Sequence, residues 1–498
     1  LLDTPLRVAV VETGGFVRSP STEALNELVN DGPLPLDTVT TRPRVLGGGS
    51  IAWGSFCTPL DSGDFAGPPE QPMHRWPFGP DELAPYYRRA QRIFELGPPE
   101  FDERLWPIFG AVPPRFDARL IRTKFWQFRS PSLLPLVAPL RFGAAFRGEL
   151  AAAQRCQVIL NATVTGIRPA NEHRHVDAID IRSLSGRRAQ IRARCFVLAA
   201  GTIENARLLL LSAIGNEHDM VGRCFMEHPH VAVATLSSAD PAALLDTWAI
   251  RRRRQSVALQ PSMCPADALR ASADILNCCL AVEIDRDPNC PTHAFAMIAE
   301  ALRHRRRLPE PWRNLWRIVS DPGTFARNAY RRLVKRSGVL PRVRSISLYS
   351  RSEQEPNPDS RVTLHRERDA LGMNRARLEW RLSERDRRTV SVFAHTVASE
   401  FVRLGIAEAA IAPWLRESAG WPEDLRGGPH HSGTTRMSDD PHTGVVDRDG
   451  RIHSMRNLYV AGASVFPTGG YVNPGLTVVA MAIRMADHLR SQLPTLTR

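Results

Sequence analysis

Lysine is almost absent from this chain of 498 residues. Lys124 and Lys335 are the only lysines among 65 basic residues, and the other 63 are arginines. Such an excess of arginine, together with 40 prolines, is typical of a GC-rich bacterial genome. The net charge of +13 is therefore a poor argument for a polyanionic partner of the whole chain.

The positive charge is concentrated in residues 250–344, which we call the arginine-rich stretch. It contains 19 arginines and lysines against 8 aspartates and glutamates, with clusters at 251–254, 303–307 and 331–336. A solvated surface is the simplest interpretation, and an acidic electron acceptor or an anionic membrane surface is the alternative. No nucleic-acid motif and no aromatic interleaving accompany the arginines, so we expect no nucleic-acid partner.

Cysteine pairs with metal-ligand spacing are also lacking. None of the eight cysteines forms a C-x-x-C pair, which argues against a zinc site and a disulfide framework and predicts reduced, buried thiols and no metal. The longest uncharged run, residues 457–483, contains four glycines, two prolines and Asn473, so it cannot form a membrane-spanning helix. We expect a soluble or peripheral protein of a bacterial cytoplasm or periplasm, whose export signal, where one exists, would precede Leu1.

A glycine-rich nucleotide turn is the third absence. Residues 6–12 form a short apolar run that ends in Glu12, as a buried parallel strand does in a dinucleotide-binding unit. There the acid bonds the ribose, and a G-x-G-x-x-G turn lies about 20 residues earlier. Only eleven residues precede Glu12, so we expect an N-terminally truncated chain that binds such a cofactor weakly. A plain strand-end acid is the alternative interpretation.

Glycines are instead concentrated in residues 47–54, which we call the glycine loop. The loop contains Gly47, Gly48, Gly49 and Ser50, followed by Trp53 and Gly54. An ordinary turn explains one or two glycines, so three beside a tryptophan predict a backbone that approaches a ligand closely.

Periodicity and turn residues predict alternating strands and helices. We expect strands at 157–161, 176–181, 189–198, 361–364, 375–381 and 458–461, and a second buried strand of the nucleotide-binding type at 196–201. Helices are expected at 82–96, 143–154 and 203–212, with a last helix ending near Leu489. Ser185-Gly186 should join 176–181 and 189–198 as a hairpin.

A capping box marks the start of one further long helix. Ser383 and Asp386 have the spacing of such a box, and the helix should end at Gly405. Its core face is predicted by helical spacing and comprises Val390, Phe393, Val397, Phe401 and Leu404.

Four segments resemble the glucose–methanol–choline (GMC) family of flavin oxidoreductases. Residues 46–53 resemble the family's flavin loop, and residues 196–205 (FVLAAGTIEN) resemble its second characteristic stretch. Residues 221–229 (VGRCFMEHP) resemble the segment that crosses between domains. The catalytic region is resembled by residues 430–437 and 458–477. Four matches in the family's order make the resemblance specific, whereas residues 236–425 match weakly.

The resemblance implies an α/β fold with two interleaved domains. A discontinuous FAD-binding, Rossmann-like domain would comprise residues 1–60, 145–235 and 426–498. An α+β substrate-binding domain on a mostly antiparallel sheet would comprise residues 61–144 and 236–425.

The same resemblance implies oxidation of a primary or secondary alcohol, such as a sugar or polyol, to a carbonyl, with the hydride passing to flavin N5. His430 stands at the family's catalytic histidine position, where a neutral imidazole accepts the hydroxyl proton. Asn473 stands at the position of its partner, and its amide would bond the developing alkoxide. His431 is the rival base, which the register of the motif disfavours. His228 and His230 are expected to have structural roles at the domain crossing, and contact with the flavin is the alternative.

Further positions that match the family are expected to bind FAD. Glu12 would hold the adenosine ribose, the glycine loop the pyrophosphate and ring, and the backbone of Val164 the adenine. The remaining residues of this set are Ala200, Gly201, Gly462, Ala463, Pro474 and Thr477. For the small residues, ordinary tight packing is the alternative. Ala52 replaces the histidine through which some members attach FAD, so we expect non-covalent FAD.

The electron acceptor is expected to be something other than oxygen. The Trp53 loop and residues 76–97 resemble bacterial dehydrogenases that pass electrons to a quinone, a cytochrome or a dye. An oxidase that produces hydrogen peroxide is the first alternative. A non-catalytic remnant without FAD is the second, and the presence of both His430 and Asn473 argues against it.

Overall fold

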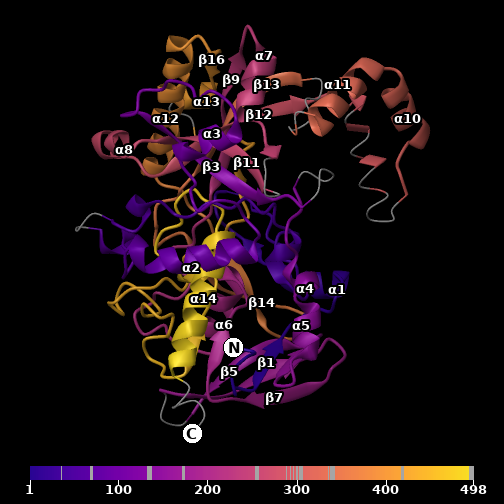
Figure 1. Cartoon of the computed structure of the whole chain (residues 1–498). Coiled ribbons are helices and arrows are strands. Elements are labelled where there is room, and N and C mark those ends of the chain that lie inside the picture. The colour runs from indigo at the N-terminus through magenta and orange to yellow at the C-terminus, as the bar shows by residue number, and fades with distance from the viewer. Residues whose placement is uncertain are drawn as a thin grey trace.

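The computed structural model has a mixed α/β architecture, as the sequence predicts (Figure 1). It describes residues 1–34, 36–67, 71–131, 137–170, 174–252, 257–287, 289–291, 293–294, 297–298, 301, 307–334, 336, 343–416 and 420–492. Six basic residues singled out from the sequence lie outside the described residues: Arg253, Arg254, Arg303, Arg305, Arg306 and Lys335.

Short parallel strands join segments that are far apart in the sequence. Strand β1 (Val8–Val11) pairs in parallel with β4 (Cys156–Ile159), and β8 (Phe196–Leu198) pairs in parallel with β18 (Leu458–Val460). A three-stranded antiparallel sheet follows β4 and is formed by β5 (Thr163–Pro169), β6 (Val176–Arg182) and β7 (Arg188–Arg192). These strands lie in the half of the molecule that holds both chain ends in Figure 1.

One strand prediction is wrong in this region. The expected strand over 189–198 is two strands, because β7 ends at Arg192 and β8 begins at Phe196. The side chain of Asn457 accounts for the break, since its amide donates to Arg194 O at 3.1 Å while Phe196 N–H donates to Asn457 O. The hairpin of β6 and β7 is confirmed, but β8 leaves it and pairs with β18.

The other half of the molecule is built on a large antiparallel sheet. Its order is β10 (Arg251–Arg252), β11 (Val257–Pro265), β12 (Cys278–Arg286), β13 (Val343–Ser352), β9 (Pro229–Ser237) and β16 (Glu408–Ile411). Strand β3 (Ile121–Arg129) adds to β11, and β17 (Arg426–Gly427) adds to β9. A small sheet of β14 (Arg361–Arg368), β15 (Asn374–Glu379) and β2 (Val29–Asn30) lies outside it.

Helix α12 (Glu384–Arg403) covers the large sheet through its apolar face. The Ser383–Asp386 capping box is confirmed, and Val390, Phe393, Val397 and Phe401 are fully buried. Helix α14 (Gly475–Ser491) packs beside α2 (Pro80–Ile93), where Arg484 donates to Glu82.

The remaining helices are short. They are α1 (Pro20–Glu23), α3 (Trp106–Phe109), α4 (Phe142–Ala145), α5 (Arg147–Ala152), α6 (Thr202–Leu211), α7 (Pro241–Trp248), α8 (Asp267–Ala273), α10 (Pro311–Val319), α11 (Pro322–Leu333) and α13 (Pro413–Arg416). In the part of the chain that the structure describes, no helix has the length and apolar composition needed to cross a membrane.

Candidate functional site

Two distant segments are held side by side at the start of strand β9. Met226 and Ser432 exchange backbone hydrogen bonds, with Met226 N–H donating to Ser432 O at 3.0 Å and Ser432 N–H donating to Met226 O at 2.9 Å. This pairing places Glu227 and His228 against His430. Gly433 allows the close approach, because its φ is +89° and a Cβ there would lie 2.2 Å from Cys224 O.

Four histidines gather at this junction, and we call them the histidine cluster: His228, His230, His430 and His431. His430 Nδ1 lies 2.9 Å from His228 Nδ1, and the ring centroids of His430 and His230 are 5.9 Å apart. Gly428 completes the packing, since a Cβ there would lie 2.7 Å from both His230 Nε2 and His430 Nδ1. The predicted base therefore lies among neighbouring imidazoles.

Asn473 reaches the other side of the His430 ring. Its Nδ2 lies 2.8 Å from His430 Nε2. Asn473 directly precedes Pro474, the residue that caps the N-terminus of α14. The structure thus brings together the two residues predicted to be catalytic, although 43 positions separate them.

Burial controls the charge of the cluster. Desolvation lowers the pKa of His430 well below its ordinary value, and the neighbouring His228, His230 and Arg351 act in the same direction. Desolvation likewise lowers the pKa of His228 to about 4 and that of His431 to about 3. Neutral rings are the result at neutral pH, and a neutral ring is what a proton-accepting histidine requires.

The tautomer of His430 is set by its two neighbours. An amide NH₂ can only donate, so Asn473 Nδ2 directs a hydrogen towards His430 Nε2, which is then the accepting nitrogen. The ring's one proton therefore lies on Nδ1, which donates to His228 Nδ1. The backbone of Gly469 and Gly470 hydrogen-bonds to the His228 ring and raises its pKa, as accepting carbonyls do. These contacts leave His228 Nδ1 as an acceptor.

Glu227 binds the backbone of the histidine cluster through its carboxyl group. Its side chain is fully buried, and the N–H of His430 donates to its two carboxyl oxygens at 2.8 and 3.0 Å. The N–H of His228 donates to the same carboxyl group at 2.7 Å. Desolvation raises the pKa of Glu227 to about 8, so the 3.4 Å contact with the neutral ring of His431 is not an ion pair at neutral pH.

The glycine loop lies against the N-terminus of α14. A Cβ on Gly475 would lie 2.7 Å from the ring of Trp53, whose Nε1 donates to Leu140 O at 3.1 Å. Trp53 packs on Phe94 and Phe142, with ring centroids 5.2 Å apart in each pair. These contacts place the glycine loop next to the turn that carries Asn473 and Pro474.

The glycines of the glycine loop lie in different surroundings. Gly47 is required by packing, because its φ is +101° and a Cβ there would lie 2.5 Å from Gly143 N. A Cβ on Gly48 or Gly49 would meet no atom within 4 Å, so these two border open space. Ser50 is buried and its hydroxyl donates to Gly47 O, while Gly54 packs at the ring of Phe56.

A second open surface lies where the parallel strands β8 and β18 end. Gly201 (φ +91°) follows β8 and Gly462 (φ +107°) follows β18, and a Cβ on either would meet no atom within 4 Å. Ala200 is exposed and Ala463 is half-buried. The side chain of Asn205 ties the two ends together, because it accepts from Ala200 N–H and donates to Ala461 O.

Strand β1 is followed directly by the carboxyl group of Glu12. Glu12 is half-buried and accepts from Gly14 N–H at 2.8 Å, and desolvation raises its pKa. Val164 is half-buried in the neighbouring β5, two residues after Ala162, whose N–H donates to Glu12 O. Thr477, by contrast, is fully buried and its hydroxyl hydrogen-bonds to that of Tyr87 at 2.9 Å.

Known proteins resemble this chain in sequence and in fold. Residues 145–230 and 356–482 match the two models of the GMC oxidoreductase family. The chain is 26% identical to paromamine 6'-oxidase of Streptomyces fradiae, over 90% of this chain and 79% of that protein. It is 23% identical to the fructose dehydrogenase large subunit of Gluconobacter japonicus, over 70% of this chain and 58% of that protein. A formate oxidase structure from Aspergillus oryzae RIB40, studied for its FAD modification, has a TM-score of 0.55 at 15% identity and covers 99% of this chain and 95% of that one.

The chain belongs to the GMC oxidoreductase family. The resemblance found in the sequence is thereby confirmed, and so is the class of fold. FAD is the cofactor that the family and its solved relatives support.

The open surfaces of this GMC oxidoreductase fit a large planar cofactor with a diphosphate. At Gly48, Gly49, Gly201 and Gly462 any side chain would enter open space, so bare backbone lines that space. Two of these glycines follow the carboxyl ends of parallel strands, where α/β folds bind nucleotides. The half-buried acid of Glu12 lies at the end of a third parallel strand. The residues present therefore fit FAD.

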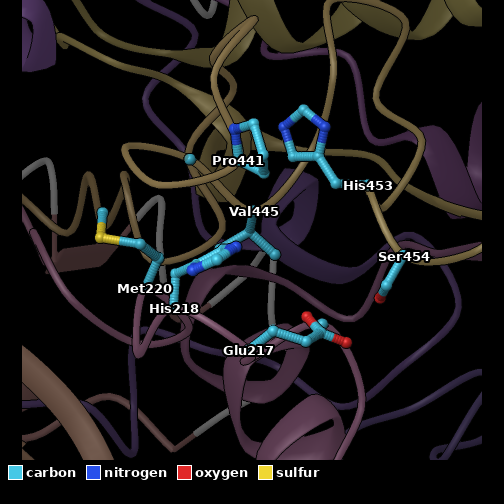
Figure 2. Close-up of a pocket in the computed structure, with 9 residues that line it drawn as sticks. Glu217, His218, Met220, Pro441, Val445, His453 and Ser454 are labelled. Carbon is cyan, nitrogen blue, oxygen red and sulfur yellow. The ribbon is translucent and has the colours of Figure 1, made fainter.

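One pocket lies away from these residues and has no part in this arrangement. It has a volume of about 200 Å³ and is lined by Gly215, Glu217, His218, Met220, Pro441, Gly444, Val445, His453 and Ser454. Figure 2 shows Glu217 and His218 on one side of it and Pro441 and His453 on the other. Among the described residues, no three metal-ligating side chains converge on an ion site, here or elsewhere.

Sequence reasoning missed the contacts of Glu227 and His228. Both residues stand in the quoted segment 221–229, but their roles depend on the pairing of Met226 with Ser432 across 200 residues. The sequence did offer a signal: Glu227 stands directly before His228-Pro229, and a pair of histidines, His430 and His431, follows later in the chain.

Proposed function

We propose that this GMC oxidoreductase oxidises a primary or secondary alcohol, such as a sugar or polyol, to a carbonyl, with FAD as the hydride acceptor. One observation carries the proposal: His430 Nε2 and Asn473 Nδ2 lie 2.8 Å apart beside the N-terminus of α14, next to the glycine loop. Two relatives are named for paromamine and fructose, which supports a hydroxyl-rich substrate.

The residues of the chain divide the work on the hydroxyl group. His430 Nε2 takes the hydroxyl proton, since its lone pair faces Asn473 and the ring is neutral. Asn473 Nδ2 donates to the alcohol oxygen and stabilises the negative charge that develops there. FAD, when bound, supplies the acceptor for the hydride that leaves the carbinol carbon.

His228 and Glu227 act through His430 as positioning residues. His228 Nδ1 accepts a hydrogen bond from His430 Nδ1–H and so keeps Nε2 unprotonated, as the base requires. The same contact stabilises the imidazolium that forms when Nε2 is protonated. Glu227 fixes the backbone of His430 and His228 through three N–H···O bonds.

His230 is proposed as a contact for a substrate hydroxyl. Its Nε2 is buried and has no hydrogen-bond partner in the structure, and its ring lies 5.9 Å from that of His430. A buried polar atom without a partner costs stability unless a ligand satisfies it. Replacing His230 by Phe should raise KM for the substrate more than it lowers kcat, since the base is untouched.

FAD is proposed to be held without a covalent bond. Ala52, which lies next to Trp53 in the glycine loop, has no nucleophilic side chain. The flavin should therefore remain in the supernatant after acid precipitation of the protein, and flavin in the pellet would contradict this proposal. The remaining cofactor contacts proposed are Glu12, Gly48, Gly49, Val164, Ala200, Gly201, Gly462, Ala463, Pro474 and Thr477.

We further propose that the two halves of the molecule bind different ligands. The large sheet built from β3, β9 to β13, β16 and β17 would bind the substrate, and the parallel strand ends would bind FAD. Electrons would then pass to an acceptor other than oxygen, such as a quinone or a cytochrome. An oxidase is the second candidate, because paromamine 6'-oxidase covers most of this chain. Hydrogen peroxide formed in stoichiometric amounts, without an added acceptor, would favour the oxidase.

The test is anaerobic reduction of the FAD-loaded protein by a panel of sugars, polyols and simple alcohols. At least one compound should bleach the flavin absorbance of the wild-type protein, and the His430→Ala variant should retain FAD but bleach far more slowly. A wild-type protein that holds FAD and is bleached by none of them, while dithionite still reduces it, would overturn the proposed function.

A further inference from the structure

The α10–α11 hairpin, residues 311–333, has its amphipathic faces reversed. On α10, Trp312, Leu315, Trp316 and Val319 repeat with helical spacing and form one face. That face points outwards, since Trp312 is 81% and Trp316 71% exposed. The polar Asn314 is buried on the opposite side, where its Nδ2 donates to Pro309 O at 2.8 Å.

Helix α11 repeats the same reversal. Phe325, Tyr330 and Leu333 are exposed, whereas Asn328 and Arg331 are buried. Arg331 donates to Asp246 of α7 at 2.5 Å, which ties the hairpin to the body of the protein through its polar side. Large apolar side chains are thus exposed on two consecutive helices.

This concentration of exposed apolar groups is confined to one place. Among the described residues, eight of the seventeen exposed large hydrophobic side chains lie between 312 and 334. Isolated exposed apolar residues are common on soluble proteins, but a contiguous patch marks an interaction surface. Figure 1 shows α10 and α11 projecting to the side of the large sheet, so that a broad, flat partner can reach them.

The charge around the hairpin identifies the partner. The described residues 307–334 contain six arginines and only two acids, Glu310 and Asp321. Arg313 and Arg327 are exposed beside the apolar faces. Tryptophan and tyrosine are favoured at the boundary between headgroups and acyl chains, and arginine is favoured near anionic headgroups.

We propose that the α10–α11 hairpin docks on an anionic membrane surface. The apolar faces of the two helices enter the boundary between headgroups and acyl chains, and the surrounding arginines contact lipid phosphates. Acidity of a protein partner would account for the arginines alone, whereas an anionic bilayer accounts for the arginines and also for tryptophan at the depth of the headgroups. The bilayer satisfies both features at once.

Flotation of the full chain with lipid vesicles tests the proposal. The protein should float with vesicles of equal parts phosphatidylcholine and phosphatidylglycerol, and not with phosphatidylcholine alone. The double variant Trp312→Ser/Trp316→Ser should lower vesicle affinity by about tenfold or more, because it removes the inserting groups. Arg313→Gln/Arg327→Gln should also lower it by about tenfold or more, and added salt should weaken binding.

Val112→Ser is the matched control, since Val112 is 84% exposed and lies far from the hairpin in sequence. This variant should bind anionic vesicles and show the vesicle-induced blue shift of tryptophan fluorescence as the wild type does, whereas the tryptophan variant should lose that shift. The proposal is overturned by any of three results. These are a wild-type chain that ignores anionic vesicles, a tryptophan variant that binds them normally, and a dimer of the wild type that the tryptophan substitutions dissociate.

Discussion

The histidine cluster and the α10–α11 hairpin place polar and apolar groups in opposite ways. Around His430 most polar atoms are paired: Glu227 accepts from the backbone N–H groups of His228 and His430, and His430 contacts a partner through each ring nitrogen. On the hairpin the tryptophans are exposed and asparagine is buried. A site whose polar groups are held by one another is preorganised, whereas an exposed apolar face indicates an interaction surface.

The comparison also separates two kinds of energetic cost. Substitutions in the histidine cluster should change the reaction and, at Glu227, the stability of the fold. Substitutions on the exposed face of the hairpin should change neither, because no intramolecular packing is lost there.

Removing the base should have the largest effect. His430→Ala deletes the nitrogen proposed to take the hydroxyl proton, so the rate of flavin reduction by substrate should fall by about 10²- to 10⁴-fold. The FAD content should be unchanged, and stopped-flow absorbance measures the rate. His395→Ala is the control, because His395 is an exposed histidine of α12. A fall of less than a few-fold would assign the proton transfer to another group.

Replacing His228 should produce a smaller loss that depends on the shape of the new side chain. His228→Leu removes the acceptor for His430 Nδ1–H, so kcat should fall by about tenfold to a hundredfold with little change in KM. In His228→Asn the amide oxygen can take the place of Nδ1, whereas His228→Gln carries its amide too far from the backbone.

Rescue by Asn and not by Gln is therefore the expected pattern, measured as kcat for each variant with thermal melting as a check on the fold. Equal kcat values in the Leu and Asn variants would indicate that His228 only packs against His430.

The pH dependence of the reaction should reflect burial of the base. A lowered pKa keeps His430 neutral, and therefore able to accept a proton, on the acid side of its ordinary range. The kcat/KM of the wild type should then stay flat as the pH falls through about 6.5, the value for an unperturbed histidine. A drop centred on that value would show that the site is more hydrated when substrate binds.

Glu227 should link stability to pH. Burial raises its pKa to about 8 in the folded protein, so its proton stabilises the fold most fully below the ordinary carboxyl pKa of 4.5, and this stabilisation is lost as the pH rises through about 8. The side chain of Glu227→Gln cannot ionise. Between pH 4.5 and about 8, the free energy of unfolding of this variant should therefore fall less steeply with pH than that of the wild type. The two slopes should differ by up to about 1.4 kcal/mol per pH unit.

The same substitution also places an NH₂ group where Glu227 Oε2 accepts from the N–H of His430. Glu227→Gln should therefore be destabilised by about 1–3 kcal/mol near pH 5, where the wild-type side chain is protonated. The exposed Glu408→Gln is the control for both measurements, which are urea titrations at several pH values. Parallel pH curves for wild type and Glu227→Gln would remove Glu227 from the linkage.

The sequence predicted the site better where the signal was local or motif-based. The positions of His430 and Asn473 match the catalytic pair of the family that the sequence resembles, and the structure brings their side chains together. The capping box of α12 is a contact between neighbours and is confirmed. Glu227 was not assigned a role, because an isolated glutamate gives no sign that pairing of Met226 with Ser432 will bury it.

Periodicity also fails to distinguish covered from uncovered faces. The spacing of Val390, Phe393 and Val397 indicates a core face and is confirmed. Trp312, Leu315 and Trp316 have the same kind of spacing, yet their face is exposed. Whether an apolar stripe finds a partner depends on the tertiary arrangement, and the strand expected over 189–198 was wrong for the same reason, since the distant Asn457 ends it.

The smallest effect is expected on the exposed face of the hairpin. Trp312→Ser/Trp316→Ser should change the free energy of unfolding by less than about 1 kcal/mol, because side chains that are 81% and 71% exposed lose little packing. Trp380→Ser is the matched comparison, since Trp380 is fully buried and donates to Gln354 Oε1 at 2.9 Å, and it should cost about 3–5 kcal/mol. Urea titration of both variants without lipid gives the two values. A large loss in the hairpin variant would mean that its tryptophans stabilise the fold, and the contrast between the two regions would no longer hold.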